Sequence, residues 1–322
     1  MKEVIDTALV VTKFKSVEIG EGTGNLVIDG ATMILNCNDT VKINPGSYNS
    51  IAIRNITCKD GCSIIITNKG LVKLDGDFKS MGLKNLNGVK ITGDGDPNIK
   101  YGFQFINNIY RAVTITQPYN NVTLQHMSFT NIKDYSISAN QEIEYNGSED
   151  SYSKNLKFLH MRCEKISSLI NFAGNIVNDK ITGYTKGVEI ANIEYSDSNS
   201  GSVAYFGNAE NYDIHHNRID NMNKTNNNHN GIFHIRGNGR FHNNFVSNHQ
   251  GNAIRAHSFT VGSTPKDVLI YNNIVFNSRK YSAFEVQGFG YSITPGKTTY
   301  VNAKVFNNTC GSLNSSNDWQ GN

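Results

Sequence analysis

The stretch NGRFHNNFVSNH (residues 238–249) is followed by DVLIYNNIVFNS (267–278) and NAKVFNNTCGSL (302–313), and all three share one pattern. Apolar residues alternate with polar ones, a pair of asparagines follows, and a second alternating run comes after the pair. Four earlier stretches that begin at residues 121, 155, 187 and 211 fit the same frame, so the unit recurs every 24 to 35 residues. Alternation with a period of two is typical of β-strands, and no segment shows a sustained helical period.

Each copy of this unit contains two or three short alternating runs, which are too few strands to bury an apolar face alone. Stacked copies bury a continuous core, so the repeat predicts an all-β fold, a parallel β-solenoid. Asparagines that recur at one position of the unit should stack and bond to one another through their amides. One such set is Asn217, Asn244, Asn273 and Asn308, and a second is Asn221, Asn248 and Asn277.

A further alternating run lies between consecutive copies, and in IFHIRG (232–237) and AIRAHS (253–258) its polar positions are histidine and arginine. Alternate side chains of a strand face opposite ways. Stacked strands lie ~4.8 Å apart, so we expect the outward residues to form two adjacent columns on one surface. The first column contains Asn171, Tyr205, His234, Arg255 and Glu285, and the second contains Arg236, His257 and Gln287.

The concentration of arginine and histidine in these columns points to an acidic ligand, because like charges this close together need a counter-ion. Glycoside hydrolysis normally uses two carboxylates, and Glu285 is the one carboxylate in the columns, which disfavours a hydrolase. β-Elimination in a uronate polymer needs a group that neutralises the carboxylate, a base for the proton at C5 and an acid for the leaving oxygen. Arginine and histidine suit the first two roles.

We therefore expect a polysaccharide lyase that cleaves an acidic, uronate-containing polysaccharide. Arg255 is predicted to neutralise the carboxylate, with Arg236 as the alternative. His234 is the predicted base, and Tyr205 or His257 is the predicted acid. The remaining side chains are predicted to bind the substrate: Arg236, Glu285, Gln287 and Asn171.

The repeated NN-x-(I/V)-x-x-N elements resemble those of the pectate-lyase-like single-stranded right-handed parallel β-helix superfamily, over about residues 49–311. This resemblance implies a right-handed coil. NNFVSNHQGNAIRAHS (243–258) is also similar to the N-T-F-x-x-x-x-G-x-x-x-x-x-R-H-G coil of the chondroitinase-B/alginate-lyase family, whose arginine is catalytic. In this sequence Arg255 comes one residue early after Gly251, and His234 corresponds to that family's basic lysine. The family's calcium-binding acidic residues have no counterpart in this sequence, so no metal ligand is predicted. Calcium stays an open option as cofactor.

Other interpretations use the same columns. A non-catalytic polysaccharide-binding protein, such as a tailspike or adhesin-like β-helix, would display aromatic residues along its groove, and Tyr205 is the one aromatic residue in the columns. A C5 epimerase shares proton abstraction with the lyase and differs in how the proton returns. A purely structural interpretation makes Arg255 and Glu285 a surface ion pair worth at most about 1 kcal/mol, with solvated histidines around it.

Composition limits the partners. The 322 residues carry a net charge of +3 and only 18 % charged residues, without the polybasic tract expected for nucleic-acid or membrane-surface binding. No run approaches the roughly 20 apolar residues that span a bilayer. The first residues, MKEVIDTALVVTKFKSVEIG, are too interrupted by charge for a secretory signal. We nevertheless expect a bacterial protein that is secreted, periplasmic or on the cell surface, because a groove for a polymer has no evident cytosolic substrate.

The chain divides into a predicted N-terminal cap and first coil (1–48), a β-helix (49–311) and a polar tail (312–322). The cap should cover strand edges that would otherwise stay unpaired. Insertions on one side of a solenoid commonly wall a binding face, and insertions are predicted at 141–154, 175–186, 223–230, 260–266 and 290–300.

The cysteines are Cys37, Cys58, Cys62, Cys163 and Cys310. CKDGC (58–62) is not a zinc spacing, and no second pair of cysteines or histidines follows at a suitable distance. We expect the cysteines to be buried and unpaired, with a Cys58–Cys62 disulfide as the alternative.

Overall fold

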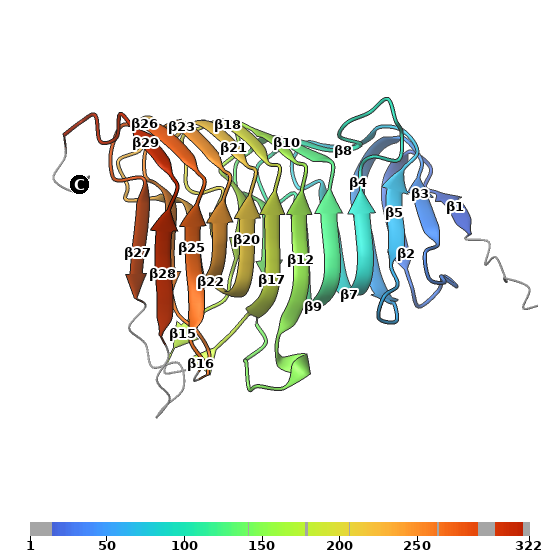
Figure 1. The fold of residues 1–322 in the computed structure, drawn as a ribbon. Coiled ribbons are helices and arrows are strands. Elements are labelled where there is room, and N and C mark those ends of the chain that lie inside the picture. The colour runs from blue at the N-terminus through green and yellow to red at the C-terminus, as the bar shows by residue number, and fades with distance from the viewer. Residues whose placement is uncertain are drawn as a thin grey trace, which may run out of the picture.

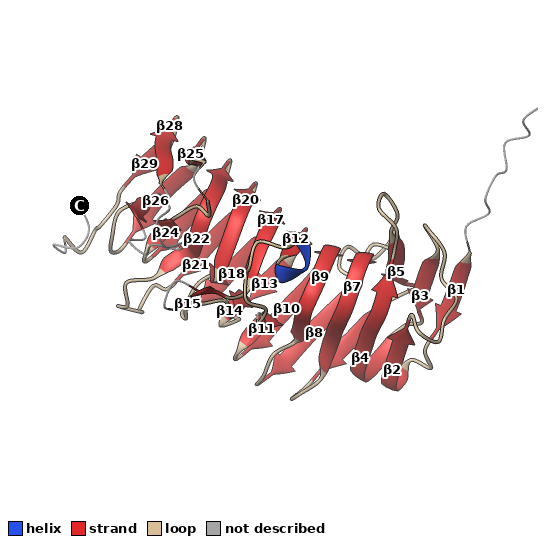
Figure 2. Ribbon diagram, turned by 90° about the horizontal axis from the view of Figure 1, so that it is seen from below, coloured by secondary structure: helices blue, strands red, loops and turns tan. Residues whose placement is uncertain are grey.

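The computed structural model describes residues 15–140, 142–177, 180–205, 207–262, 264–288 and 300–317. Over these ranges the chain forms strands that lie side by side along one elongated stack (Figures 1 and 2). The sole helical element in the described ranges is a 3-10 turn, Glu149–Ser151 (η1). None of the described residues forms a helix long and apolar enough to cross a membrane. The prediction of an all-β, solenoid-like fold is confirmed.

The main sheet consists of parallel pairings in which each strand bonds to a strand one coil further along the chain. Among the described residues these pairings form three ladders, which we name A, B and C. Ladder A contains β1 (Ser16–Ile19), β3 (Thr40–Ile43), β5 (Ile64–Asn68), the second halves of β7 (Ser80–Thr92) and β9 (Val113–Gln125), β12 (Ser153–Leu159), β17 (Tyr184–Ala191), β20 (Asn208–His215), the second half of β22 (Gly231–His242), β25 (Lys266–Tyr271) and β28 (Val301–Phe306).

Ladder B contains β2 (Thr23–Asp29), β4 (Gly46–Thr57), the first halves of β7 and β9, β11 (Tyr135–Asn140), β14 (Ser168–Phe172), β19 (Ala204–Tyr205), the first half of β22, β24 (Asn252–Ser258) and β27 (Phe284–Gly288). Ladder C contains β6 (Val72–Asp75), β8 (Phe103–Asn108), β10 (Met127–Ile132), β13 (Arg162–Glu164), β18 (Glu194–Ser198), β21 (Arg218–Met222), β23 (Phe245–His249), β26 (Ile274–Ser278) and β29 (Thr309–Gly311). The chain passes through the ladders in the order B, A, C within each coil.

Alternation along each strand puts one set of side chains into a single apolar core. In β22 the inward residues Phe233, Ile235 and Phe241 are fully buried, as is Ile254 of β24. Between them, His234 and its neighbours in ladder B face outward. The ladders described here begin with β1, so residues 16–48 also pair in parallel with later strands. The division of the chain at residue 48, and the cap assigned to the first part, stay predictions.

The first predicted asparagine set forms a continuous buried chain of amides. The Nδ2 of Asn217 donates to Asn244 Oδ1 at 2.9 Å, and Asn244 donates to Asn273 at 3.0 Å. Asn273 donates to Asn308 at 2.9 Å. Each amide therefore bonds to its counterpart in the next coil, and this ladder is confirmed.

The second predicted asparagine set forms only in part. Asn277 donates to Asn248 Oδ1 at 3.3 Å, as predicted. Asn248, however, donates to Asp220 Oδ1 at 2.7 Å, and Asn221 donates to Asp197. Carboxylates therefore interrupt the amide chain, and the prediction is wrong for Asn221. The backbone explains why asparagine recurs there, because φ is 55° at Asn221 and 51° at Asn248. Asparagine tolerates this left-handed conformation better than most residues do.

The cysteine prediction is wrong for one pair. Cys37 and Cys62 form a disulfide that joins two coils. Cys163 is buried and free, as expected, whereas Cys58 is half-buried and Cys310 is exposed. The alternative Cys58–Cys62 pairing does not form. The Cys37–Cys62 separation of 25 residues is one repeat interval, which brings the two cysteines together by stacking.

The insertions of 141–154, 175–186 and 260–266 each leave ladder B and enter ladder A. They pack together around a small apolar cluster that is separate from the main core. The antiparallel pair β15 (Ile176–Val177) and β16 (Lys180–Ile181) belongs to the second insertion. We call these three insertions the wall. Its buried apolar members are Tyr152, Ile181 and Tyr184, and Phe259, which directly precedes the third insertion, packs with them. Of the predicted insertion at 290–300, residues 290–299 lie outside the described residues, as do the last five of the predicted tail.

Candidate functional site

The register of ladder B forms both predicted columns. Tyr205 of β19 is the partner of His234 in β22, His234 is the partner of Arg255 in β24, and Arg255 is the partner of Glu285 in β27. Asn171 of β14 precedes Tyr205 in the same column. The second column runs through Arg236, His257 and Gln287. The stacking order deduced from the repeat is therefore the one that the structure has.

His234 lies at the centre of an aromatic group. Its Nε2 is 3.3 Å from the Nδ1 of His257, across the two columns. The two imidazole rings are edge-on, with centroids 4.6 Å apart, and the Tyr205 ring meets His234 edge-on at 4.9 Å. One of the two facing nitrogens must carry a proton and the other must accept it, so the pair is a coupled donor and acceptor. Tyr205, His234 and His257 therefore stand close enough to exchange protons with one ligand.

Both histidines are held neutral by their surroundings. Burial, together with the nearby His257 and Arg255, lowers the pKa of His234 to about 3. Burial also lowers the pKa of His257 to about 4, reinforced by Arg255 and opposed by Glu285. Two imidazoles and two guanidinium groups thus share a surface with one carboxylate. A second negative charge bound here would raise both pKa values toward the neutral range, because an opposite charge favours the protonated form.

Arg255 is held by two partners. Its Nε donates to Glu285 Oε1 at 3.0 Å, and its Nη1 donates to the carbonyl oxygen of His229 at 3.2 Å. The side chains of Arg255 and Glu285 are only 22 % and 19 % exposed, so this pair is more buried than a surface ion pair. The purely structural interpretation gave this ion pair at most about 1 kcal/mol, the value for an exposed pair. Partial burial strengthens such hydrogen bonds, so we expect the Arg255–Glu285 pair to contribute more than that.

His229 is a site residue that the sequence pattern did not reveal. It belongs to the predicted insertion 223–230, which leaves ladder C and enters ladder B. Its ring stacks on Tyr281 with centroids 4.1 Å apart, and its Nε2 lies 3.0 Å from Glu285 Oε2 and 3.1 Å from Asn252 Oδ1. Through Glu285 and its own carbonyl, His229 fixes the orientation of Arg255. No periodicity marks a loop residue, which is why alternation could not find it.

The surface beside this group is hollowed into a pocket of about 230 Å³. The residues that line this pocket include Tyr135, Ser202, Tyr205, His229 and His234. The pocket lies on the side of ladder B that adjoins the insertion 223–230, opposite the wall. It is large enough for part of a sugar ring and is open to a longer chain.

The remaining predicted site residues lie further from this pocket. Asn171 is half-buried at the far end of the first column, and Gln287 is exposed at the end of the second column. Arg236 is half-buried beside His257. Among the residues described here, no three side chains of histidine, cysteine, aspartate or glutamate are arranged to hold a metal ion. Calcium therefore has no ligand set in the described part of the chain, and no chemistry is derived from it.

No family model matches the sequence, and no curated protein matches it. Solved structures that match include the alginate lyase from Paenibacillus sp. str. FPU-7, with 10 % identity over 92 % of this chain and 97 % of that one, at a TM-score of 0.49. The PL6 family alginate lyase AlyGC matches with 13 % identity over 92 % of this chain and 40 % of that one, at 0.38. The Agl-KA catalytic domain matches with 12 % identity over 92 % and 62 %, at 0.25. At these identities and scores the likeness assigns no role to any residue of this chain.

Proposed function

We propose that this protein is an extracellular polysaccharide lyase that cleaves a uronate-containing polysaccharide by β-elimination, built on a right-handed parallel β-helix. The handedness follows from a general rule, since crossover connections between parallel strands of one sheet are almost always right-handed. The observation that carries the function is the concentration of arginine and imidazole groups in the ladder B columns. Two arginines and two buried imidazoles face one carboxylate there.

In this proposal Arg255 grips the uronate carboxylate and makes the proton at C5 more acidic. A guanidinium binds a carboxylate through two parallel hydrogen bonds and cannot lose its own proton. With Nε held by Glu285 and Nη1 held by His229, the remaining N–H groups of Arg255 face the ligand. Arg236, Gln287 and Asn171 bind neighbouring parts of the chain.

His234 takes the proton from C5, the C4–O bond breaks, and a double bond forms between C4 and C5. Tyr205 or His257 gives a proton to the leaving oxygen. A base with a pKa of about 3 is weak, so the proposal requires the substrate carboxylate to raise the pKa of His234 on binding. The direct contact between His234 and His257 provides a path by which the accepted proton leaves the first ring.

The proposed location outside the cytoplasm is supported by the Cys37–Cys62 disulfide. Disulfides persist in secreted, periplasmic and cell-surface proteins and are rare in the reducing cytosol. The proposed ligand, a large anionic polymer, is found in the same compartments.

The test is incubation of the purified protein with alginate, pectate, chondroitin and heparan, following the ultraviolet absorbance of unsaturated uronate. Absorbance that rises with one polymer supports a lyase. An epimerase would leave the absorbance unchanged but exchange the C5 proton with heavy water, and a binding protein would do neither while still retaining the polymer. Failure to bind, exchange or cleave any of the four polymers would refute the proposal.

A further inference from the structure

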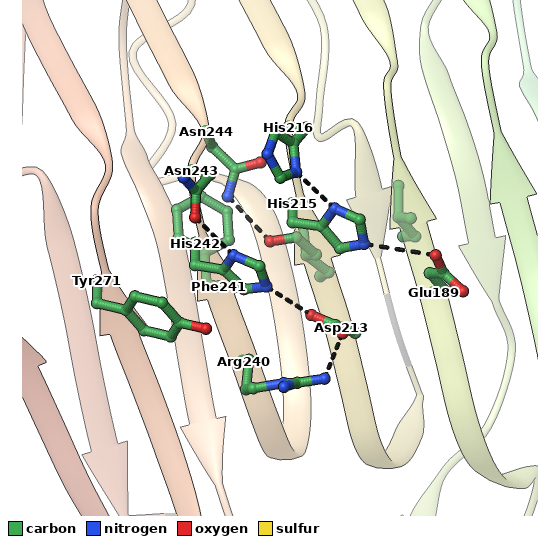
Figure 3. A network of polar contacts seen from close by, with 12 residues as sticks. Glu189, Asp213, His215, His216, Arg240, Phe241, His242, Asn243, Asn244 and Tyr271 are labelled. Atoms are coloured by element: carbon green, nitrogen blue, oxygen red, sulfur yellow. Dashed lines mark hydrogen bonds and ion pairs between the residues drawn. The ribbon is translucent and has the colours of Figure 1, made fainter.

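A second polar cluster lies on ladder A, on the opposite side of the wall from the candidate site. It is built from β17, β20, the second half of β22 and β25 (Figure 3). The register places Lys157, Glu189, Asp213 and Arg240 in one column, with Leu269 after them. A neighbouring column contains His215 and His242. β22 thus carries residues of both sites, and its chain bends between them at Gly237 and Gly239.

Every charge in the first of these columns has an opposite charge beside it. Lys157 Nζ lies 2.7 Å from Glu189 Oε2, and Arg240 is paired with Asp213. His242 Nε2 lies 2.9 Å from Asp213 Oδ1, and His215 Nε2 lies 3.4 Å from Glu189 Oε1. Figure 3 shows Asp213 between Arg240 and His242, and the contact of His215 with Glu189 beside it.

The cluster lies against a surface hollow of about 570 Å³, larger than the pocket beside His234. Three cations and three carboxylates line it: Lys157, Arg240, Lys266, Glu189, Asp213 and Asp267. The hollow is therefore electrically balanced, unlike the ladder B columns. Along the column two carboxylates, Glu189 and Asp213, lie between two cations, Lys157 and Arg240, at the ~4.8 Å spacing of stacked strands.

We propose that this hollow binds a neutral, hydroxyl-rich saccharide. A sugar hydroxyl donates one hydrogen bond and accepts others. A surface that carries ammonium, guanidinium and carboxylate groups side by side can therefore bond to it both as donor and as acceptor. An anionic chain would gain no net attraction here, because the three carboxylates offset the three cations. An imidazole and phenol stack continues beside the hollow, with His215 and His242 rings 5.0 Å apart and His242 and Tyr271 rings 4.8 Å apart.

The competing explanation is that the network only stabilises the stack of coils. Ion pairs between strands would do so without any ligand. That explanation accounts for the paired charges, but it does not require the open volume in front of them. Binding of a ligand in the hollow therefore separates the two explanations.

The experiment is a titration of the wild-type protein with three neutral hexasaccharides, from xylan, mannan and β-1,4-glucan, and with oligoguluronate as the anionic probe. Imidazole NMR signals locate the binding, because His215 and His242 adjoin the hollow while His234 and His257 lie at the other site. We expect at least one neutral probe to shift the His215 and His242 signals and leave those of His234 and His257 unmoved. This outcome does not depend on lyase activity, so the two proposals can fail separately.

The double variant Glu189→Gln/Asp213→Asn keeps the shapes of the side chains and removes two acceptor charges. We expect it to weaken binding of that neutral probe by about tenfold or more, since hydrogen bonds to charged groups are the strong ones. Lys90→Gln is the matched control, because Lys90 lies in the same column two strands before Lys157, outside the hollow. The proposal is overturned if no neutral probe binds at millimolar concentration, if only oligoguluronate shifts these signals, or if the double variant and the control bind equally well.

Discussion

The two halves of β22 carry opposite kinds of surface. The first half, in ladder B, contributes His234 and Arg236 to columns with excess positive charge and buried imidazoles. The second half, in ladder A, contributes Arg240 and His242 to a network in which each charge is paired. Both halves have the same alternation and the same stacking, so the fold does not distinguish them. What distinguishes them is the set of polar residues: ladder B gathers two arginines and two imidazoles around one carboxylate, whereas ladder A places a carboxylate beside each cation. A surface rich in arginine and imidazole is the better candidate for an anionic ligand.

The largest effect is expected at the arginine that is proposed to bind the substrate carboxylate. Arg255→Ala should lower turnover by about a thousandfold, because the carboxylate clamp would be lost. Arg255→Lys should recover little, since an ammonium lacks the planar fork. Steady-state kinetics on the polymer that responds in the absorbance screen measures both variants. If the alanine variant keeps more than about a tenth of the activity, the lost transition-state stabilisation is under about 1.4 kcal/mol. That result would show that Arg255 does not bind the reacting carboxylate.

The same variant should also lower the free energy of unfolding. A surface substitution usually changes the free energy of unfolding by less than about 0.5 kcal/mol. Arg255 is half-buried and bonded to both Glu285 and His229, so Arg255→Ala should cost about 1 to 2 kcal/mol. Urea denaturation of the wild type and the variant checks this. Equal midpoints would show that the pair adds nothing to the fold.

His234→Gln should lower turnover by about a hundredfold or more, because glutamine keeps a polar group and cannot act as a base. His242→Gln is the matched control, from the other half of the same strand. It should leave turnover within about twofold of the wild type. If the two variants lose activity equally, the distinction between the two faces fails.

His229→Ala should have an intermediate effect, about tenfold on kcat, because His229 orients Arg255 without touching the reacting atoms. As a positioning residue it should also change the pH profile, since its ring contacts Glu285. His229→Gln keeps a polar side chain that can bond to Asn252 and should recover part of the loss. A His229→Ala variant with unchanged kcat and pH profile would show that His229 does not position Arg255.

The smallest effect concerns acid stability. The pKa values of His234 and His257 are about 3 and 4 in the fold, against 6.5 as the ordinary value. Their neutral forms therefore stabilise the fold fully above pH ~6.5, and this contribution is lost as pH falls toward 4, where the unfolded chain binds more protons. The double variant His234→Gln/His257→Gln should lose less stability between pH 7 and about 4.5 than the wild type does. His216→Gln, at an exposed ring, should keep the wild-type slope; equal slopes for all three proteins would contradict the burial of the pair.

The sequence alone predicted the columns of ladder B correctly, because alternation and a constant repeat position determine which residues stack. The same reasoning placed the amide chain from Asn217 to Asn308. It failed where contacts do not follow the repeat position alone. His229 lies in a loop, and Asn221 bonds to a carboxylate, Asp197, that interrupts its set.

The ladder A cluster was missed for a different reason. His215 and His216 are adjacent in the sequence and directly precede Asn217, the first asparagine of the buried amide chain. In the structure His215 ends β20, whereas His216 lies beyond the strand with φ of 55°. Because His216 adopts a left-handed conformation, the alternation of inward and outward side chains ends there. A period of two therefore no longer predicts which way the following side chains face. The Cys37–Cys62 disulfide could have been found, since its spacing equals one repeat interval.

The most direct test of the central claim is the mass of the product that the wild-type protein releases from a uronate polymer. A lyase adds no water across the broken bond, so each new non-reducing end should be one water lighter than a hydrolysis product. We predict unsaturated oligosaccharides from at least one of alginate, pectate, chondroitin and heparan, and none from the Arg255→Ala variant. Saturated products, or unsaturated products released equally by the variant, would contradict the assignment of β-elimination to the ladder B columns.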